Sequence, residues 1–459
     1  MIHRYQKKGL NFVLDVNSGA VHLLDDISYA VSGLLDENMG DTCPQSIIDA
    51  LPDYTADEIR EAYGELYELK KAGQLFAQDD YIDVSRYIPV NAPVKALCLH
   101  VAHDCNLRCK YCFASTGDFG QGRKIMPPDI AKKAIDFVIA RSGVRHNIEV
   151  DFFGGEPLMA WDTVTQTVDY ARSLEEKYNK KFRFTITTNG LLLDEDKRKY
   201  INENMDNCVL SLDGRREVND EFRKTVAGTG SYDTIVPKFK ALVDERDPNL
   251  DYYARGTFTS HNLDFAEDVL SIADAGFDRL SVEPVTADPG CGYDLTEDDL
   301  PKIEAEYDRL TDIMLERKKE GKPFTFFHFM VDLDQGPCVV KRLRGCGAGY
   351  EYVAVTPDGD IYPCHQFVGK DEFKQGSVLD QSFNMDIAQK FAGMNIYSRP
   401  KCQKCWAKFY CSGGCSAANY NMNHDMNDSY DLGCEMERKR LECAIYLKAM
   451  DKICANQSK

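Results

Sequence analysis

The chain has no apolar run close to the roughly 20 residues that a membrane-spanning helix needs. Its first residues, MIHRYQKKGLNF, lack the apolar segment of a secretory signal peptide. It also lacks an excess of basic residues, and its formal net charge of -19 disfavours nucleic acids and anionic membranes as partners. These absences predict a cytoplasmic protein.

Cysteine, by contrast, is abundant, with 17 residues in 459. In a reducing compartment such a set favours metal binding or catalysis over a disulfide framework. Three cysteines fall within residues 105–112 and ten within residues 338–454, whereas the others are scattered singly: Cys43, Cys98, Cys208 and Cys291. For Cys208 and Cys291 we expect no more than core packing.

Length and pattern predict an α/β protein of about three segments. Residues 1–88 combine a hairpin around NSG with three helical patterns. The last of these has Thr55 and Glu58 at capping-box spacing and ends at Gly73. This order is typical of a winged-helix-like module. It can serve as a structural cap or bind a peptide at an open sheet edge.

Residues 94–325 alternate strand and helix patterns, which predicts a partial (β/α)6 TIM barrel. The expected strands are 94–102, 147–155, 182–190, 207–214, 252–260 and 278–285. The motifs CNLRCKYC, GGEP, TTNG and SLDG each follow one of the first four strands. Because loops after parallel strands meet at one end of a barrel, we expect these motifs to face one mouth. Residues 338–459 are loop-rich and cysteine-rich, with a helical tail from about Met436.

The stretch HDCNLRCKYCFA spaces Cys105, Cys109 and Cys112 as C-x3-C-x2-C. Structural zinc sites use four ligands, and His103 is a candidate fourth. A [4Fe–4S] cluster bound by three thiolates keeps one iron open to an external ligand. This spacing on the first βα loop of a barrel favours the cluster.

CNLRCKYC resembles the signature of the radical S-adenosylmethionine (radical SAM) enzymes, and the resemblance extends over the middle segment. It implies that the three cysteines hold a SAM-binding [4Fe–4S] cluster that yields a 5′-deoxyadenosyl radical. By resemblance, the turn formed by Gly154, Gly155, Glu156 and Pro157 binds the methionine amino group. Tyr111 and Phe113 contact adenine, and Ser211, Asp213 and Arg223 lie near the ribose and the carboxylate. Thr187 and Asn189 are more simply explained as part of a common turn.

The later cysteines resemble the SPASM extension of radical SAM enzymes that modify peptides, which implies two auxiliary [4Fe–4S] clusters. By resemblance, one cluster takes Cys402, Cys405, Cys411 and Cys434, and the other takes Cys346, Cys364 and Cys415. The fourth ligand of the second set is either Cys338 or an open position for a substrate thiolate. A zinc-ribbon interpretation leaves Cys346, Cys364 and Cys434 unexplained. Cys443 and Cys454 are expected to be core residues or free thiols, and His365 to hydrogen-bond locally.

Residues 1–88 resemble the RiPP recognition element, a module that binds the leader of a ribosomally made precursor peptide. The three parts together resemble thioether (sactionine-type) synthases, most of all the maturases of cysteine-rich SCIFF peptides. The resemblance implies a link from a cysteine sulfur to a backbone carbon, with Thr as one candidate acceptor, and a low-potential electron donor. A formylglycine-forming maturase, a carbon–carbon cross-linking enzyme and a non-catalytic iron–sulfur electron carrier remain as alternatives. The GGEP turn argues against the carrier.

Overall fold

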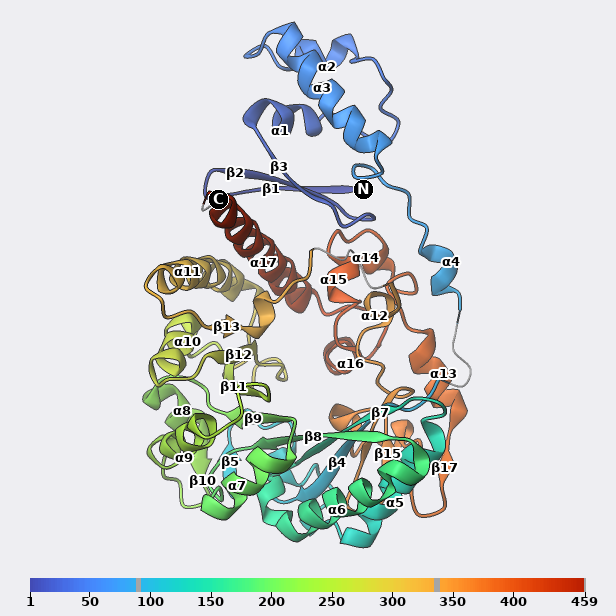
Figure 1. The fold of residues 1–459 in the computed structure, drawn as a ribbon, viewed down its shortest axis with the longest axis vertical. Helices are drawn as coiled ribbons and strands as arrows, with labels where there is room; N and C mark the ends of the chain where they lie inside the picture. The colour runs from blue at the N-terminus through green and yellow to red at the C-terminus, as the bar shows by residue number, and fades with distance from the viewer. Residues whose placement is uncertain (88–91, 334–338, 458–459) are drawn as a thin grey trace. The chain divides into compact units, whose positions relative to one another are not determined.

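The computed structural model describes residues 1–87, 92–333 and 339–457, which form two compact units. We call residues 92–328 and 346–393 the barrel unit. Residues 1–87, 329–333, 339–345 and 394–457 form the terminal unit. Each unit is thus assembled from segments that are distant in the sequence (Figure 1).

The barrel unit is built on a mostly parallel sheet. Its neighbouring strands are β4 (Ala96–His103), β7 (Asn147–Gly154), β8 (Lys181–Thr188), β9 (Asn207–Ser211), β11 (Asp251–Phe258) and β12 (Arg279–Pro284). All six correspond to the predicted strands, so the partial barrel is confirmed. At its ends the sheet gains β13 (Thr325–Phe326) beside β12, and β14 (Tyr352–Val355) parallel to β4.

Shorter strands complete this unit. The antiparallel strands β15 (Asp360–Tyr362), β16 (Gly376–Ser377) and β17 (Ser382–Phe383) follow β14 in the sheet, and β6 (Lys124–Ile125) pairs with β4. A separate antiparallel pair joins β5 (Leu107–Cys109) to β10 (Arg223–Thr225). Residues 352–383 therefore extend the barrel sheet, which the predicted loop-rich character of this region did not anticipate.

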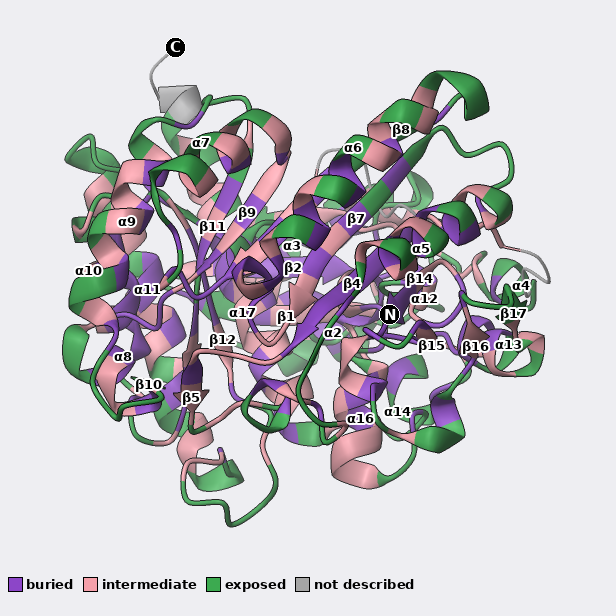
Figure 2. Ribbon diagram, turned by 90° about the horizontal axis from the view of Figure 1, so that it is seen from below, coloured by how far each residue is buried: buried purple, intermediate pink, exposed green. Residues whose placement is uncertain are grey.

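Amphipathic helices cover the sheet. They are α5 (Pro128–Arg141), α6 (Trp161–Tyr178), α7 (Glu195–Asn204), α8 (Arg216–Phe222), α9 (Tyr232–Asp244), α10 (Phe265–Asp274), α11 (Leu300–Lys319) and α13 (Met385–Gly393). Buried residues run along β4, whereas the outward turns of the surrounding helices are exposed (Figure 2). Fully buried rings such as Phe152, Phe182 and Phe184 fill the space under the helices. This burial holds the strand ends, and the loops that follow them, in place.

The terminal unit begins with an antiparallel sheet in the order β1 (Ile2–Lys7), β2 (Leu10–Asp15), β3 (Val21–Leu24). Helices α1 (Asp26–Ser32), α2 (Gln45–Ala50), α3 (Ala56–Lys71) and α4 (Ile82–Ser85) follow. The Thr55–Glu58 capping box of α3 is confirmed. Strand β1, which was not predicted, joins β2 through a turn with positive φ at Lys8 and Gly9.

The C-terminal part of this unit is mainly helical. It contains α12 (Val339–Arg344), α14 (Pro400–Gln403), α15 (Lys408–Cys411), α16 (Ser416–Asn423) and α17 (Asp431–Gln457). The tail helix α17 begins at Asp431 rather than near Met436, so Cys434 lies on the helix and not before it.

Residues 1–87 share a core with this C-terminal part. Val16 and Leu343 pack in one apolar cluster with Ile396, Cys402 and Phe409. A buried polar contact lies nearby, since the Lys408 ammonium is 2.8 Å from Asp79 and its side chain is only 4% exposed. Within the described residues, no helix has the length and apolar character needed to cross a membrane.

Candidate cofactor and cluster sites

The three closely spaced cysteines lie on the loop after the first barrel strand. Cys105 follows β4, Cys109 ends β5, and Cys112 lies in the turn beyond it. Pairing of β5 with β10 sets Cys109 opposite Arg223 and fixes one side of the loop. Burial raises the pKa of Cys105 to about 12 and that of Cys109 to about 11, the latter despite the charge of Arg223. These thiols therefore keep their protons at neutral pH until a metal displaces them.

Glycine is required where GGEP meets the cysteine loop. A Cβ on Gly154 would lie 2.2 Å from the Ala102 carbonyl oxygen, and φ there is +128°. A Cβ on Gly155 would lie 2.1 Å from the Asp104 carbonyl oxygen. The Gly155 N–H donates to Ala102 at 2.7 Å and the Glu156 N–H donates to Asp104 at 2.9 Å. Only bare backbone can come this close to the strand that leads into Cys105.

Glu156 joins GGEP to the TTNG motif after β8. Its side chain is buried, and its carboxylate accepts hydrogen bonds from the Leu158 N–H at 3.0 Å, the Thr188 hydroxyl at 2.7 Å and the Asn189 N–H at 2.7 Å. The carboxylate is therefore fully engaged by the chain. Asn189 continues this connection, because its amide nitrogen lies 3.6 Å from the Cys105 sulfur.

A second buried network lies on the opposite side of the cysteine loop. The Tyr111 hydroxyl lies 2.6 and 2.8 Å from the two carboxylate oxygens of Asp213, and Arg223 donates to the same hydroxyl at 2.9 Å. Burial raises the pKa of Asp213 to about 6, although Arg223 opposes the shift. Tyr111 is thereby fixed between Asp213, which follows β9, and Arg223, which begins β10.

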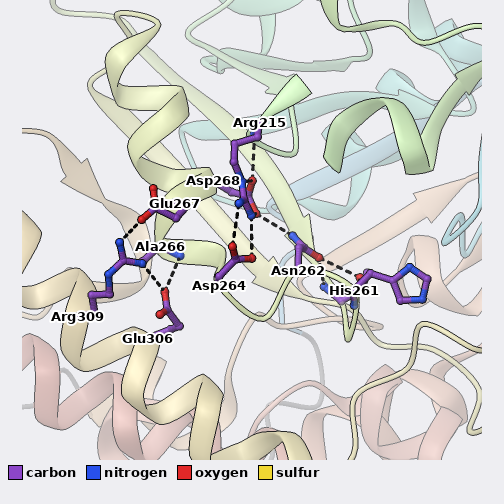
Figure 3. Close-up of polar contacts among 10 residues, drawn as sticks. Arg215, His261, Asn262, Asp264, Ala266, Glu267, Asp268, Glu306 and Arg309 are labelled. Carbon is purple, nitrogen blue, oxygen red and sulfur yellow. Dashed lines mark hydrogen bonds and ion pairs between the residues drawn. The ribbon is translucent and has the colours of Figure 1, made fainter. Parts of the chain in front are cut away.

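The turn after Asp213 is held by a polar network on α10 (Figure 3). Arg215 forms ion pairs at 2.8 Å with Asp264 and with Asp268, whose side chain is fully buried. Asn262 donates to Asp268 at 3.0 Å. Gly214 is required here, because a Cβ would lie 2.3 Å from the Asp268 Cβ. The ends of β9 and β11 are thus fixed relative to each other.

These motifs line one cavity of about 420 Å³. Its wall includes most of the predicted site: Cys105, Cys109, Tyr111, Cys112, Phe113, Gly154, Gly155, Glu156, Ser211 and Arg223. Pro157 and Asp213 are not in the wall; Pro157 is buried at the start of the short helix Pro157–Ala160, and Asp213 is buried and hydrogen-bonded to Tyr111. The expectation that the four motifs face one mouth is thereby met by Cys105, Glu156, Asn189 and Ser211.

This cavity fits the cofactors that the motifs imply. Three thiols at one end match the donor set of a cubane with one open iron. The buried Arg223 Nε has no hydrogen-bond partner within the described part of the chain, which suits an anionic group such as a carboxylate. Phe113 is 46% exposed and presents an aromatic face at the wall.

Sequence reasoning missed several residues of the cavity wall. They come from inward positions of the strands and from the segment after β14: Cys98, Asp151, Thr185, Arg255, Thr257, Glu283, Tyr352, His365 and Gln366. His365 does hydrogen-bond locally, with its Nδ1 3.4 Å from the Tyr352 hydroxyl. The sequence did contain a signal for two of them. In VDFF and FTITT, polar Asp151 and Thr185 alternate with apolar residues, and side chains two apart in a strand share a face.

A second cavity, of about 340 Å³, lies in the terminal unit. Its wall contains Cys402, Cys405, Cys411 and Cys434, which are the four cysteines expected to bind one auxiliary cluster. Burial raises the pKa of Cys411 to about 12 and that of Cys434 to about 11. Four thiols around a space of this size fit a [4Fe–4S] cluster closed by protein ligands.

The remaining cysteines have different surroundings. Cys346 and Cys364 belong to the barrel unit and Cys415 to the terminal unit, so the ligand set expected for the other auxiliary cluster stays a prediction. Cys338 lies outside the described residues. Cys208 is buried as expected, but the same expectation for Cys291 is wrong, because it is exposed in a loop after β12. Cys443 is a core residue and Cys454 is exposed.

Comparison with known families assigns the class of protein. Residues 99–251 match the radical SAM superfamily model, and residues 346–406 match the SPASM iron-sulfur cluster-binding domain. The chain is therefore a radical SAM enzyme with a SPASM domain. Its cofactors are SAM, a SAM-binding [4Fe–4S] cluster and auxiliary clusters.

The sequence identity to individual proteins with a stated activity or a solved structure is low. The chain is 25% identical over 350 residues to a cysteine-type anaerobic sulfatase-maturating enzyme of Clostridium novyi, covering 72% of this chain and 90% of that one. Its fold is similar to that of anSMEcpe with bound AdoMet and a peptide (TM-score 0.63, 20% identity, 78% of this chain and 99% of that one). It is also similar to Streptococcus suis SuiB bound to precursor peptide SuiA (TM-score 0.52, 16% identity, 93% and 97%).

Proposed function

We propose that this enzyme forms a thioether between a cysteine sulfur and a backbone carbon of a ribosomally made, cysteine-rich precursor peptide. The acceptor residue is open, with Thr as one candidate. One observation carries the proposal: a small antiparallel sheet with helices, residues 1–75, shares a compact unit with a cavity lined by four cysteines. The sheet edge would bind the peptide, and a cluster in the cavity would accept the electron that the peptide loses.

The barrel unit would bind and orient the cofactors. When bound, the reduced cluster and SAM supply a 5′-deoxyadenosyl radical. Cys105, Cys109 and Cys112 would ligate iron, and the GGEP backbone would hold the methionine amino group. Arg223, whose Nε is unpaired in the described residues, would hold the carboxylate. Tyr111 and Phe113 would contact adenine, and Ser211 would lie near the ribose.

The leader peptide would be recognised by the first module. In the described residues, β3 pairs with β2 only, so its other edge offers backbone groups to an added strand. Leu23 on this strand is 42% exposed and can contact a leader side chain. Similarity to SuiB, a protein seen with a precursor peptide, supports the same substrate class. We also propose a cytoplasmic location, where a low-potential electron donor is available.

Formylglycine formation on a sulfatase is a second candidate, favoured by the 25% identity to the Clostridium novyi enzyme. The anSMEcpe match covers 78% of the chain, whereas the SuiB match covers 93%. Because the similarity to SuiB extends over more of this chain, we favour a precursor peptide over a sulfatase as the substrate. A carbon–carbon cross-link would need the same leader site and is distinguished only by the product.

The test uses anaerobically reconstituted full-length protein with SAM, a reductant and cysteine-rich precursor peptides that carry their leaders. We expect 5′-deoxyadenosine and a peptide mass loss of about 2 Da per link, because two hydrogens leave. Alkylation should then label one thiol fewer per link. A product that keeps every thiol free would refute thioether formation and favour a carbon–carbon link. Conversion of a cysteine to an aldehyde would favour the formylglycine alternative.

A further inference from the structure

The floor of the barrel cavity carries a layer of polar side chains that the proposed cofactor contacts do not use. Cys98 on β4 pairs in register with Asp151 on β7, and Asp151 pairs with Thr185 on β8. All three line the cavity, together with Tyr352 on β14. Asp151 precedes Gly154 by three residues, or roughly 10 Å along a strand. The same cavity is therefore lined both by the GGEP turn and by this layer.

Asp151 differs from the other carboxylates in the cavity wall. Glu156 accepts three hydrogen bonds from the chain, and Glu283 forms an ion pair with Arg255. Asp151 accepts a hydrogen bond from Thr185, is repelled by Glu149, and lies near the neutral side chains of Cys98 and Tyr352. Asp151 is therefore the wall carboxylate that has kept its capacity to accept a proton.

The proposed reaction requires such a group. Joining a cysteine sulfur to a carbon breaks one S–H and one C–H bond and forms one C–S bond. One hydrogen atom, one electron and one proton must leave the peptide. The cofactors, when bound, would supply the acceptors of the hydrogen atom and of the electron, whereas the proton needs a base. We propose that Asp151 is the catalytic base that accepts the proton of the substrate thiol, an inference that rests on the proposed function.

The surroundings of Asp151 suit this role. Burial raises its pKa to about 7, with a further contribution from Glu149 and an opposing one from the Thr185 hydroxyl. Burial also raises the pKa of Cys98 and of Tyr352 well above their ordinary values, so both stay protonated around neutral pH. Of these facing groups, Asp151 is the one that changes charge near neutral pH, which is where a general base works best.

The test compares Asp151→Asn with Thr185→Val, which removes the hydroxyl but keeps the carboxylate. For each, product and 5′-deoxyadenosine are measured between pH 6 and 8. We expect Asp151→Asn to keep SAM cleavage within a few-fold and to lose product about 10²- to 10⁴-fold. The ratio of product to 5′-deoxyadenosine should rise with pH in the wild type, because the base must be deprotonated. The ratio should stay flat in Asp151→Asn, whereas Thr185→Val should keep the rise.

Two further measurements complete the test. Iron content and affinity for a precursor peptide with its core cysteines changed to serine should match the wild type in Asp151→Asn. Asp151→Glu, which keeps a carboxylate, should recover part of the product if Asp151→Asn loses iron. The role of Asp151 is overturned if Asp151→Asn has the wild-type ratio of product to 5′-deoxyadenosine. It is also overturned if this ratio depends on pH in Asp151→Asn as it does in the wild type. If the wild type makes formylglycine, the thioether proposal fails, but a thiol still loses its proton and the same ratios decide on Asp151. A carbon–carbon link, which uses no thiol, overturns both. A wild type that leaves every peptide unchanged overturns both.

Discussion

Replacing Glu156 by Gln should weaken SAM binding through the backbone rather than through a lost cofactor contact. The carboxylate accepts from two N–H groups, those of Leu158 and Asn189, on different oxygens. The amide nitrogen of Gln must face one of these donors, whichever way the side chain is turned. A buried N–H without an acceptor costs about 1–3 kcal/mol. If this cost falls on the GGEP turn, it corresponds to about 5- to 150-fold in SAM affinity.

The assay is equilibrium binding of SAM to the reconstituted protein, with 5′-deoxyadenosine formation as a second measure. Glu149→Gln is the matched control, because Glu149 is an exposed residue of β7, the strand that leads into the GGEP turn. The control should bind SAM as the wild type does, and iron content should be unchanged in both variants. Wild-type SAM affinity in Glu156→Gln would show that the GGEP turn keeps its position without the carboxylate, and would refute this reasoning.

Three further predictions concern the supports of the two sites. Changing Cys105, Cys109 and Cys112 to Ala should abolish SAM cleavage and lower iron from about twelve to about eight per chain, as measured by iron and sulfide analysis. Asp268→Ala should destabilise the barrel unit by about 1–3 kcal/mol, because the buried Asn262 amide and the Arg215 guanidinium lose an acceptor, although Arg215 keeps Asp264. Asp264→Asn, at a half-exposed partner, should cost less in the same denaturation experiment. Asp79→Asn should lower the thermal midpoint and the auxiliary iron content, because it leaves the Lys408 ammonium buried and unpaired.

The strands of the barrel could be predicted because their patterns are local. Runs such as 147–155 and 182–190 are bounded by turn residues, and β–α alternation then requires a parallel sheet. The cysteine spacing and the GGEP glycines were also readable, since each motif is contiguous. The structure adds the reason for the glycines, which is close approach to the carbonyls of Ala102 and Asp104.

What could not be predicted depends on contacts between distant segments. Val16 packs with Cys402 and Asp79 pairs with Lys408, although more than 300 residues separate each pair. Pairing of β14 with β4 brings Tyr352 beside Cys98. No local pattern encodes such contacts. Asp151 was overlooked for a related reason: a carboxylate inside a strand is informative only when its neighbours are known, and among the residues that the structure describes none of those that shift its pKa is a cation.

A pH-dependent contact restrains the cysteine loop from outside. The His261 ring lies 2.8 Å from a Glu221 carboxylate oxygen through Nδ1, and 2.8 Å from the Gly292 carbonyl through Nε2. The hydrogen bond to Glu221, followed by that to Gly292, raises the pKa of His261. Tyr293, the next residue, donates to the Lys110 carbonyl at 3.0 Å, between Cys109 and Tyr111. The loop at Gly292 is thereby linked to the cluster-binding loop.

A raised histidine pKa means that the contact is complete below the unfolded value of about 6.5 and is lost as pH rises through the folded value. The neutral ring can donate to only one of its two acceptors. Since the side chain is 40% exposed, the contribution is at most about 1 kcal/mol. Hydrogen exchange of residues 288–294, corrected for the intrinsic rate, should therefore lose up to about fivefold protection between pH 6 and 8. His261→Gln should remove this pH dependence and His146→Gln should keep it; equal curves for His261→Gln and the wild type would mean that the loop is held without the imidazolium.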